Sequence, residues 1–294
     1  MMIEDFLNCL RYERNRSELT VRNYERSLRD FESYFKNRES HLSWESVDSD
    51  MIRDWIESMM DKGDMASTVN NCLCAVRSFF RFALARKMVR RDPSYNVKGP
   101  KKQKPLPQFM KESEMDRLID LPQMWGETYK DVRARTIIIL FYETGIRLAE
   151  LVGLDDSDVD FVNHQLKVTG KRNKQRIVPF GEELKQTLAD YMRQRDEQPL
   201  KREEGLFLND KGRRITRNQV EVIVRKGLSQ VTTMKKRSPH VLRHTFATAM
   251  LNNGAGLESV RKLLGHESVA TTEIYTHTTF EQLKRVYENA HPRA

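Results

Sequence analysis

The chain has 294 residues, which is enough for two domains that each bury a core. Charged residues make up 32% of it, and no apolar run approaches the ~20 residues that a membrane-spanning helix needs. The formal net charge of +9 favours a polyanionic partner such as nucleic acid. The first fifteen residues lack the order of basic, apolar and small residues that marks a secretion signal, so we expect a cytoplasmic protein without membrane association.

The first 99 residues are predicted to form a helical domain. Apolar residues recur at the spacing of one helix face over 17–35, 49–59 and 67–82. We expect Ser49–Asp50 to cap the second of these helices and Ser67 to cap the third. The three cysteines, Cys9, Cys72 and Cys74, are too few and wrongly spaced for a disulfide framework or a zinc knuckle, so the last two are interpreted as helix residues.

A basic, proline-interrupted segment follows over residues 86–104. It has one acidic residue, and its prolines break regular structure. We predict an extended connection, with an interdomain linker at 100–106, that lies along a phosphate backbone; a merely solvated hinge is the alternative. The predicted DNA-binding residues are Arg86, Lys87, Arg90, Arg91, Lys98, Lys101, Lys102 and Lys104.

Residues 107–294 are predicted to form a second, mixed α/β domain, so the fold class is mainly α with a small β-sheet. Strands are expected at 159–162, 165–169 and 176–179, and the polar turn 170–174 joins the last two as a hairpin. The predicted helices cover 111–121, 132–142 with a continuation towards 151, a stretch from 182, a stretch near 218, 239–252, 257–264 and 281–289.

Two arginines in separate stretches are candidates for binding a phosphate. Arg147 stands in TGIRLAEL and Arg243 in HVLRH. A guanidinium keeps its proton and can donate to two phosphate oxygens at once, so two of them can clamp a phosphodiester without a metal. Glu150 lies three residues after Arg147, where it can orient that guanidinium. Ser238 is expected to cap, and Pro239 to begin, the helix that carries Arg243.

Three further residues can move protons or attack phosphorus. His240 titrates near neutral pH and can act as a general acid or base. Lys171, in the predicted hairpin turn, can protonate a leaving oxygen, although a lysine-rich turn is also common on its own. The phenol of Tyr275 has a free pKa near ~10, so as a nucleophile it needs a base and positive charge nearby. As one of nine tyrosines, it has a purely structural role as the alternative.

The sequence gives no reason to expect a metal or a cofactor. His240 and His244 are four residues apart, as two metal ligands on a helix can be, but Val241 stands where zinc proteases carry glutamate. We therefore expect His244 to pack or hydrogen-bond structurally.

Taken together, these stretches resemble the tyrosine recombinases, and within them the bacterial Xer proteins. TGIRLAEL, VTGKRNKQRIVPF, HVLRHTFAT and LLGHESVATTEIYTH are similar to the family's active-site boxes, and the ending HPRA is similar to the Xer tail. The resemblance covers nearly the whole chain. It implies a helical, SAM-like core-binding domain and a catalytic domain that together form a C-shaped clamp on DNA.

The resemblance also implies a role for each residue. Arg147 and Arg243 would bind the scissile phosphate, Glu150 would support them, and Lys171 would protonate the departing 5′ oxygen. His240 would exchange a proton with the nucleophile. His266 would hydrogen-bond a phosphate oxygen, and Tyr275 would form a 3′-phosphotyrosyl link.

The implied reaction is site-specific recombination of double-stranded DNA at an inverted-repeat core site, through a Holliday junction and without metal or ATP. Four protomers are expected, as a homotetramer or as a heterotetramer with a second recombinase, with the last helix docked on a neighbouring protomer. Resolution of chromosome dimers at a dif-like site, with a septal DNA translocase as a further partner, is the main expectation. The alternatives are a mobile-element integrase, a type IB topoisomerase and a non-catalytic DNA-binding architectural protein.

Overall fold

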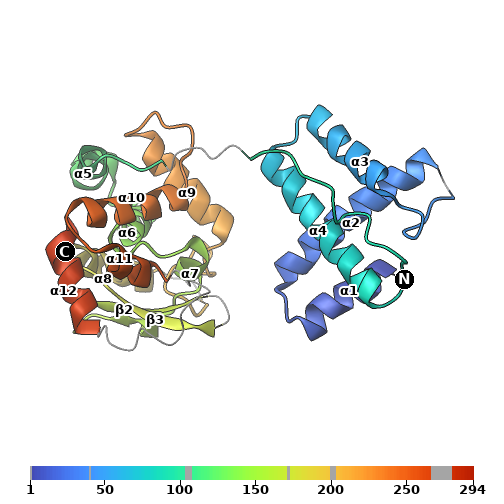
Figure 1. Cartoon of the computed structure of the whole chain (residues 1–294). Coiled ribbons are helices and arrows are strands. Elements are labelled where there is room, and N and C mark those ends of the chain that lie inside the picture. The colour runs from blue at the N-terminus through green and yellow to red at the C-terminus, as the bar shows by residue number, and fades with distance from the viewer. Residues whose placement is uncertain (1, 40, 103–107, 171–172, 199–202, 266–279) are drawn as a thin grey trace. The chain divides into compact units, whose positions relative to one another are not determined.

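The chain divides into two compact units, Met1–Pro105 and Leu106–Ala294. The computed structural model describes residues 2–39, 41–102, 108–170, 173–198, 203–265 and 280–294. Figure 1 labels the elements of both units along the chain. The division into two units agrees with the expected domain number, whereas the finer boundaries at 99 and 106 stay predictions.

The first unit is helical, as the apolar periodicity predicts. Its helices are α1 (Met2–Asn8), which continues as a π-helical turn η1 (Cys9–Glu13), then α2 (Glu18–Arg38), α3 (Ser49–Asp61) and α4 (Ala66–Ala85). The periodic faces of these helices meet in a core that is rich in aromatic side chains, in which the ring of Trp44 lies 4.3 Å from that of Phe79. Cys72 and Cys74 lie on α4, as interpreted from the sequence.

Two predicted helix caps are wrong by one or two residues. Asp48, not Ser49–Asp50, caps α3, because its carboxylate accepts a hydrogen bond from the backbone N–H of Met51 at 2.8 Å. Ser67 lies inside α4, whose N-cap is Met65 without a side-chain hydrogen bond. A serine near the start of a helix is weak evidence for the exact N-cap position when the preceding residues already turn into the helix.

The second unit contains eight α-helices, two 3₁₀ turns and a small sheet among its described residues. The helices before the sheet are α5 (Glu112–Asp120), α6 (Tyr129–Thr144) and α7 (Leu148–Val152), with the turns η2 (Pro122–Met124) and η3 (Asp156–Asp158). After the sheet come α8 (Glu182–Asp196), α9 (Arg217–Ser229), α10 (Pro239–Asn252), α11 (Leu257–Leu264) and α12 (Phe280–Ala290).

Helix α6 is the centre of the second unit. It contacts α8, α9 and α10, and its residues 136–144 are all buried. Apolar side chains on all sides are typical of a helix surrounded by other helices. The helix ends at Gly145, which has a left-handed φ of 58°, and the predicted continuation towards residue 151 is a separate helix, α7.

The sheet is antiparallel in the order β1-β2-β3, formed by Val159–Asp160, Gln165–Thr169 and Gln175–Pro179. The predicted hairpin between the second and third strands is confirmed, with Leu166 opposite Val178. The first strand is shorter than predicted, because the carboxylate of Asp160 accepts hydrogen bonds from the N–H groups of Val162 and Asn163 and turns the chain there.

The C-terminal segment packs on its own unit. Helix α12 contacts α10, α11 and β3 (Figure 1), and the side chain of Tyr287 is buried against the ring of His291 at 5.1 Å between centroids. The hydroxyl of Tyr287 donates to the Oε2 atom of Glu143 at 3.2 Å, and the backbone N–H of Gly181 donates to the same oxygen at 2.8 Å. Docking of this helix on a neighbouring protomer therefore stays a prediction about the assembled complex.

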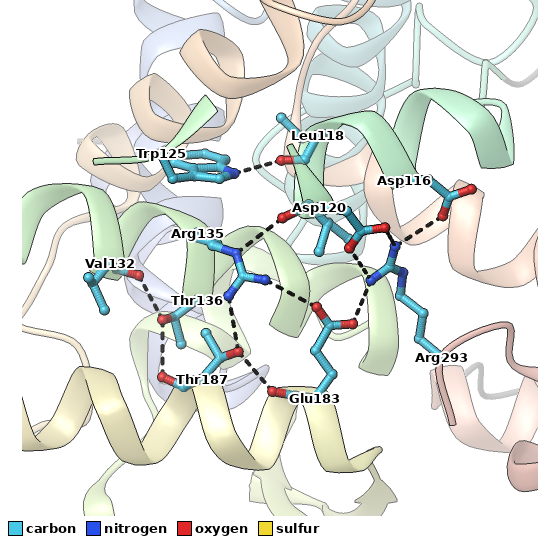
Figure 2. Close-up of polar contacts among 11 residues, drawn as sticks. Asp116, Leu118, Asp120, Trp125, Val132, Arg135, Thr136, Glu183, Thr187 and Arg293 are labelled. Atoms are coloured by element: carbon cyan, nitrogen blue, oxygen red, sulfur yellow. Dashed lines mark hydrogen bonds and ion pairs between the residues drawn. The ribbon is translucent and has the colours of Figure 1, made fainter. Parts of the chain in front are cut away.

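Arg293 anchors the end of the chain. Figure 2 shows its guanidinium between Asp120, Asp116 and Glu183, with the Nη1 atom 2.6 Å from the carboxylate of Glu183. Glu183 in turn accepts a hydrogen bond from Arg135 on α6 at 3.2 Å. The last residues thus link α5, α6 and α8.

The buried carboxyl of Glu143 predicts a pH-dependent stability. Burial raises its pKa to about 8, whereas burial lowers the pKa of His291 to about 4. From pH 6.5 to 8 the folded state holds a proton on Glu143 that the unfolded state has lost, so the free energy of unfolding should fall as pH rises through this window. Folded His291 is neutral in this window, whereas unfolded His291 loses its remaining proton just above its ordinary pKa of ~6.5, so His291 opposes the trend only weakly.

Glu143→Gln should remove this dependence. The amide oxygen can still accept from Gly181 and Tyr287, and the amide stays neutral at every pH. We expect the free energy of unfolding of the variant, minus that of the native protein, to increase between pH 6.5 and 8. The increase should be up to about 2 kcal/mol. Urea unfolding at the two pH values measures this, and parallel pH profiles for the two proteins would contradict it.

Among the helices of the described residues, none combines the length and apolar character needed to cross a membrane.

Candidate active site

Arg147 stands where the chain leaves α6 and enters α7. The left-handed turn at Gly145 ends the first helix, and a side chain there would meet the ring of Phe246 on α10, with a Cβ only 2.5 Å from its nearest carbon. Arg147 is then the N-cap of α7. Glu150, three residues on, accepts from the backbone N–H of Arg147 at 2.7 Å and from its guanidinium at 2.9 Å. The predicted orientation of Arg147 by Glu150 is therefore present in the structure.

Arg243 projects from α10 towards the same place. Its side chain is buried, and it donates to the backbone carbonyl oxygens of Gly145 at 2.5 Å and Leu264 at 2.7 Å. Within the described part of the chain it has no carboxylate partner. Burial, together with the positive charges of Arg147 and Arg176, lowers the pKa of Arg243 to about 10. The guanidinium stays protonated at neutral pH, and the charge of Glu150 offsets this effect only in part.

A third arginine, Arg176 on β3, completes the cluster. Its two Nη atoms donate to the two carboxylate oxygens of Glu150 at 2.8 and 2.9 Å, and its Nε atom donates to the carbonyl of Leu263 at 3.0 Å. Burial alone would raise the pKa of Glu150, but the ion pairs with Arg176 and Arg147 outweigh it and the pKa is lowered. Glu150 is therefore a buried carboxylate that stays ionised.

The three guanidiniums hold three consecutive carbonyls at the end of α11. Leu263 binds Arg176, Leu264 binds Arg243, and the oxygen of Gly265 accepts from Arg147 at 2.9 Å. The last carbonyls of a helix have no partner within the helix and form the negative end of its dipole, so cations stabilise them. Three positive charges meet one carboxylate here, which leaves a site with net positive charge that suits an anion.

His240 lies in the first turn of α10, directly after Pro239, and its side chain is exposed. Partial burial of the ring and the nearby charges, above all Lys236, lower its pKa. A neutral imidazole at pH 7 can accept a proton, which suits a general base. Ser238 occupies the N-cap as predicted, but its side chain makes no capping hydrogen bond, and its buried hydroxyl has no hydrogen-bond partner among the described residues.

His244 is exposed, so it does not pack within the fold, and the alternative of a structural hydrogen bond stays a prediction. No cluster of three or more potential metal ligands exists among the residues that the structure describes.

Three of the predicted site residues, Lys171, His266 and Tyr275, lie outside the described residues. The neighbours of two of them are described. Gly170, which precedes Lys171, closes the hairpin by donating to the carbonyl of Lys174 at 2.7 Å. A Cβ on Gly170 would lie 3.3 Å from the Oε1 atom of Glu150, so this end of the hairpin packs on the carboxylate. Gly265, which precedes His266, belongs to the arginine cluster.

The predicted DNA-binding residues belong to the first unit where they are described, and all seven of those are exposed. Lys104 lies outside the described residues. Arg86 forms an ion pair with Glu13 at 2.6 Å. The prediction of an extended connection from residue 86 is wrong, because Val89 and Val97 are buried in the core of the first unit and Asn70 donates to the carbonyl of Pro100 at 2.8 Å.

Arg176 is the site residue that the sequence reasoning missed. It was interpreted only as part of a strand. Alternation along β3 places it on the same side as the buried Val178, and an arginine on the inward side of a strand needs a partner. The inward position of this arginine on the strand was the feature of the sequence that could have identified it.

Comparisons with known proteins agree with this geometry. The model of the phage integrase family matches residues 108–282, and that of the phage integrase N-terminal SAM-like domain matches residues 3–87. Tyrosine recombinase XerD of Oceanobacillus iheyensis is 36% identical, over 99% of this chain and 98% of the relative. Tyrosine recombinase XerC of Natranaerobius thermophilus is 37% identical over the same shares.

Solved structures show the same fold. The Tn1549 transposon integrase in complex with transposon right end DNA has a TM-score of 0.74 at 21% identity, with 98% of each chain covered. The crystal structure of XerA recombinase is 28% identical over 100% of this chain and 99% of that chain, with a TM-score of 0.50.

The chain therefore belongs to the phage integrase family. Its relatives are tyrosine recombinases of the Xer type, and the chain is accordingly a site-specific recombinase enzyme.

Proposed function

We propose that this recombinase cuts and rejoins duplex DNA through a 3′-phosphotyrosyl bond to Tyr275. The observation that carries the proposal is the pair of guanidiniums of Arg147 and Arg243, which come from separate helices and share the end of α11. Each still has N–H groups that its protein contacts do not use, since a guanidinium has five. A scissile phosphate can therefore be held by both.

Each step of the proposed reaction has a residue to perform it. The phenolic oxygen of Tyr275 attacks phosphorus, and His240 accepts its proton. The bond to the 5′ oxygen breaks as Lys171 gives that oxygen a proton. Arg147, Arg243 and His266 stabilise the charge on the non-bridging oxygens. The new ester conserves the energy of the broken one, so the 5′ hydroxyl of the partner strand can reverse the attack without ATP or metal.

A nicked suicide substrate tests the proposal. Cleavage next to a nick releases a short oligonucleotide, so the covalent intermediate accumulates. We expect a protein–DNA adduct that survives denaturing electrophoresis with the native protein and no adduct with Tyr275→Phe, which keeps the ring and loses the nucleophile. An equal yield of adduct from Tyr275→Phe would refute the assignment. DNA binding without any adduct would support an architectural role instead.

The assembly follows from the number of strands. Each chain supplies one nucleophile, and complete exchange cuts four strands, so four protomers act in two pairs through a Holliday junction. We propose that the two units clamp the duplex at an inverted-repeat core site, as a homotetramer or together with a second recombinase. Relatives described as recombinases bound to DNA support the DNA partner, including XerH bound to its difH substrate.

For the cellular role we propose resolution of chromosome dimers at a dif-like site in the cytoplasm, with a septal DNA translocase as a further partner. Relatives named XerC and XerD over nearly the whole chain support this role, while the fold shared with a transposon integrase keeps a mobile element as the alternative. Mapping covalent adducts on DNA from the source genome separates the two. A single chromosomal core site supports the first role, and the ends of an inserted element support the second.

A further inference from the structure

We infer that Arg176 is a positioning residue for strand cleavage, acting through Glu150 and the end of α11 rather than on the DNA itself. The inference rests on the proposed function. It concerns a residue of the VTGKRNKQRIVPF stretch to which neither the residue pattern nor the family resemblance assigned a role.

The first observation is what Arg176 holds. The two Nη atoms of its guanidinium donate to the two carboxylate oxygens of Glu150. Only 2% of the Glu150 side chain is exposed. Glu150 uses the same two oxygens to hold the backbone and the guanidinium of Arg147. Without Arg176, a buried carboxylate would keep one guanidinium partner instead of two, and the orientation of Arg147 would depend on an incompletely paired group.

The second observation is the turn after α11. The Nε atom of Arg176 binds the carbonyl of Leu263, and Gly265 packs directly on the arginine. A Cβ on Gly265 would lie 3.1 Å from both the Nε and the Nη1 atoms, so it would crowd the guanidinium, and the left-handed φ of 64° favours glycine there. Arg176 thus fixes the residue that immediately precedes His266 in the sequence.

The third observation is the strand that carries Arg176. It lies on β3, six residues after Gly170, and pairs with Val168 on β2 at the base of the hairpin that contains Lys171. Gly170 itself packs on Glu150. One guanidinium therefore joins three segments: the start of α7 with Arg147, the hairpin with Lys171, and the end of α11 before His266.

This arrangement makes a specific demand on the side chain. Lysine keeps the charge but has no planar fork, so it cannot meet both carboxylate oxygens and the carbonyl at once. A positional role therefore predicts that Arg176→Lys fails almost as badly as Arg176→Met. A role through charge alone predicts that lysine restores the reaction.

The test is single-turnover cleavage of the suicide substrate by the full-length protein, with DNA affinity measured in parallel. At saturating protein we expect Arg176→Met and Arg176→Lys to form the adduct about 10²-fold more slowly, because small misplacements of catalytic groups have effects of this size. DNA affinity should stay within about threefold of the native value, since Arg176 is inferred to act on protein groups and phosphate contacts dominate affinity.

Arg214→Met is the matched control for loss of fold. Arg214 also binds two backbone carbonyls, those of Val152 and Leu154, and one carboxylate, that of Asp155, in the same unit. The Arg214→Met variant should lower the melting temperature as Arg176→Met does. Its cleavage rate should stay within about threefold of the native rate.

Three results would overturn the inference: cleavage by Arg176→Met within about threefold of native, full rescue by lysine, or an equal loss of rate in Arg214→Met. Failure of the native protein to form any adduct would instead refute the proposed function.

Discussion

Arg243→Met is expected to slow formation of the covalent adduct by about 10³-fold or more, because it removes one of the two guanidiniums that we propose to neutralise the phosphate. The structure gives Arg243 no carboxylate to balance its buried charge within the described residues. Among the residues that the structure describes, its hydrogen-bond partners are the backbone carbonyls of Gly145 and Leu264. A buried charge that is not directly paired with an opposite charge costs folding energy, and an anionic substrate would provide such a partner. The measurement is single-turnover cleavage of the suicide substrate at saturating protein.

Arg133→Met is the matched control for this prediction. Arg133 and Arg243 are both 7% exposed, lie in the same unit and donate to backbone carbonyls. Arg133 is paired with Asp210 on another part of that unit. We expect this variant to lose stability and to keep the cleavage rate per folded molecule within about threefold. A cleavage rate for Arg243→Met close to that of the native protein would remove this arginine from the proposed phosphate site.

Tyr287→Ala should destabilise the second unit by about 3–5 kcal/mol, the usual loss for truncating a large buried side chain. Tyr287 is 1% exposed, stacks on His291 and binds Glu143. Tyr287→Phe keeps the ring and loses the hydroxyl, so it should cost only about 1 kcal/mol. Equilibrium unfolding in denaturant measures both. The surface variant Glu288→Ala, on the exposed side of α12, should stay within about 0.5 kcal/mol of the native protein.

This prediction decides how a truncation is interpreted. Removing the residues after Thr279 should impair recombination, but it would also remove Tyr287 and Arg293 from the fold. Loss of activity in that variant would then follow from loss of structure as well as from loss of assembly. A stability of Tyr287→Ala equal to that of the native protein would instead show that α12 leaves its own unit in solution.

Local sequence patterns were enough to predict most elements. The bounds of α10 and α11 agree with prediction, because proline or an apolar face begins each helix and a break in periodicity ends it. The prediction that Ser67 caps α4 was wrong, because the position at which a helix starts depends on the path of the preceding chain. The extended connection after α4 was a wrong prediction because the basic residues of this segment outnumber its core residues, which include Val89 and Val97.

The site could be predicted in part. The residue types and spacing of Arg147, Glu150 and Arg243 identify them, and the structure brings all three together at the end of α11. The acceptors there are backbone carbonyls, which every residue type carries, so no sequence pattern indicates them. Arg176 was missed for a related reason: its partners are far along the chain, at Glu150 and Leu263, and only the fold brings them close.

The most direct test of the account is to identify which protein atom and which DNA end form the covalent bond. The adduct from the suicide substrate is digested with nuclease and protease, and the nucleotide-bearing peptide is sequenced by mass spectrometry. The account predicts a single modified peptide with the nucleotide on Tyr275 through its 3′ phosphate. A nucleotide on any other residue, or a link through a 5′ phosphate, would contradict it.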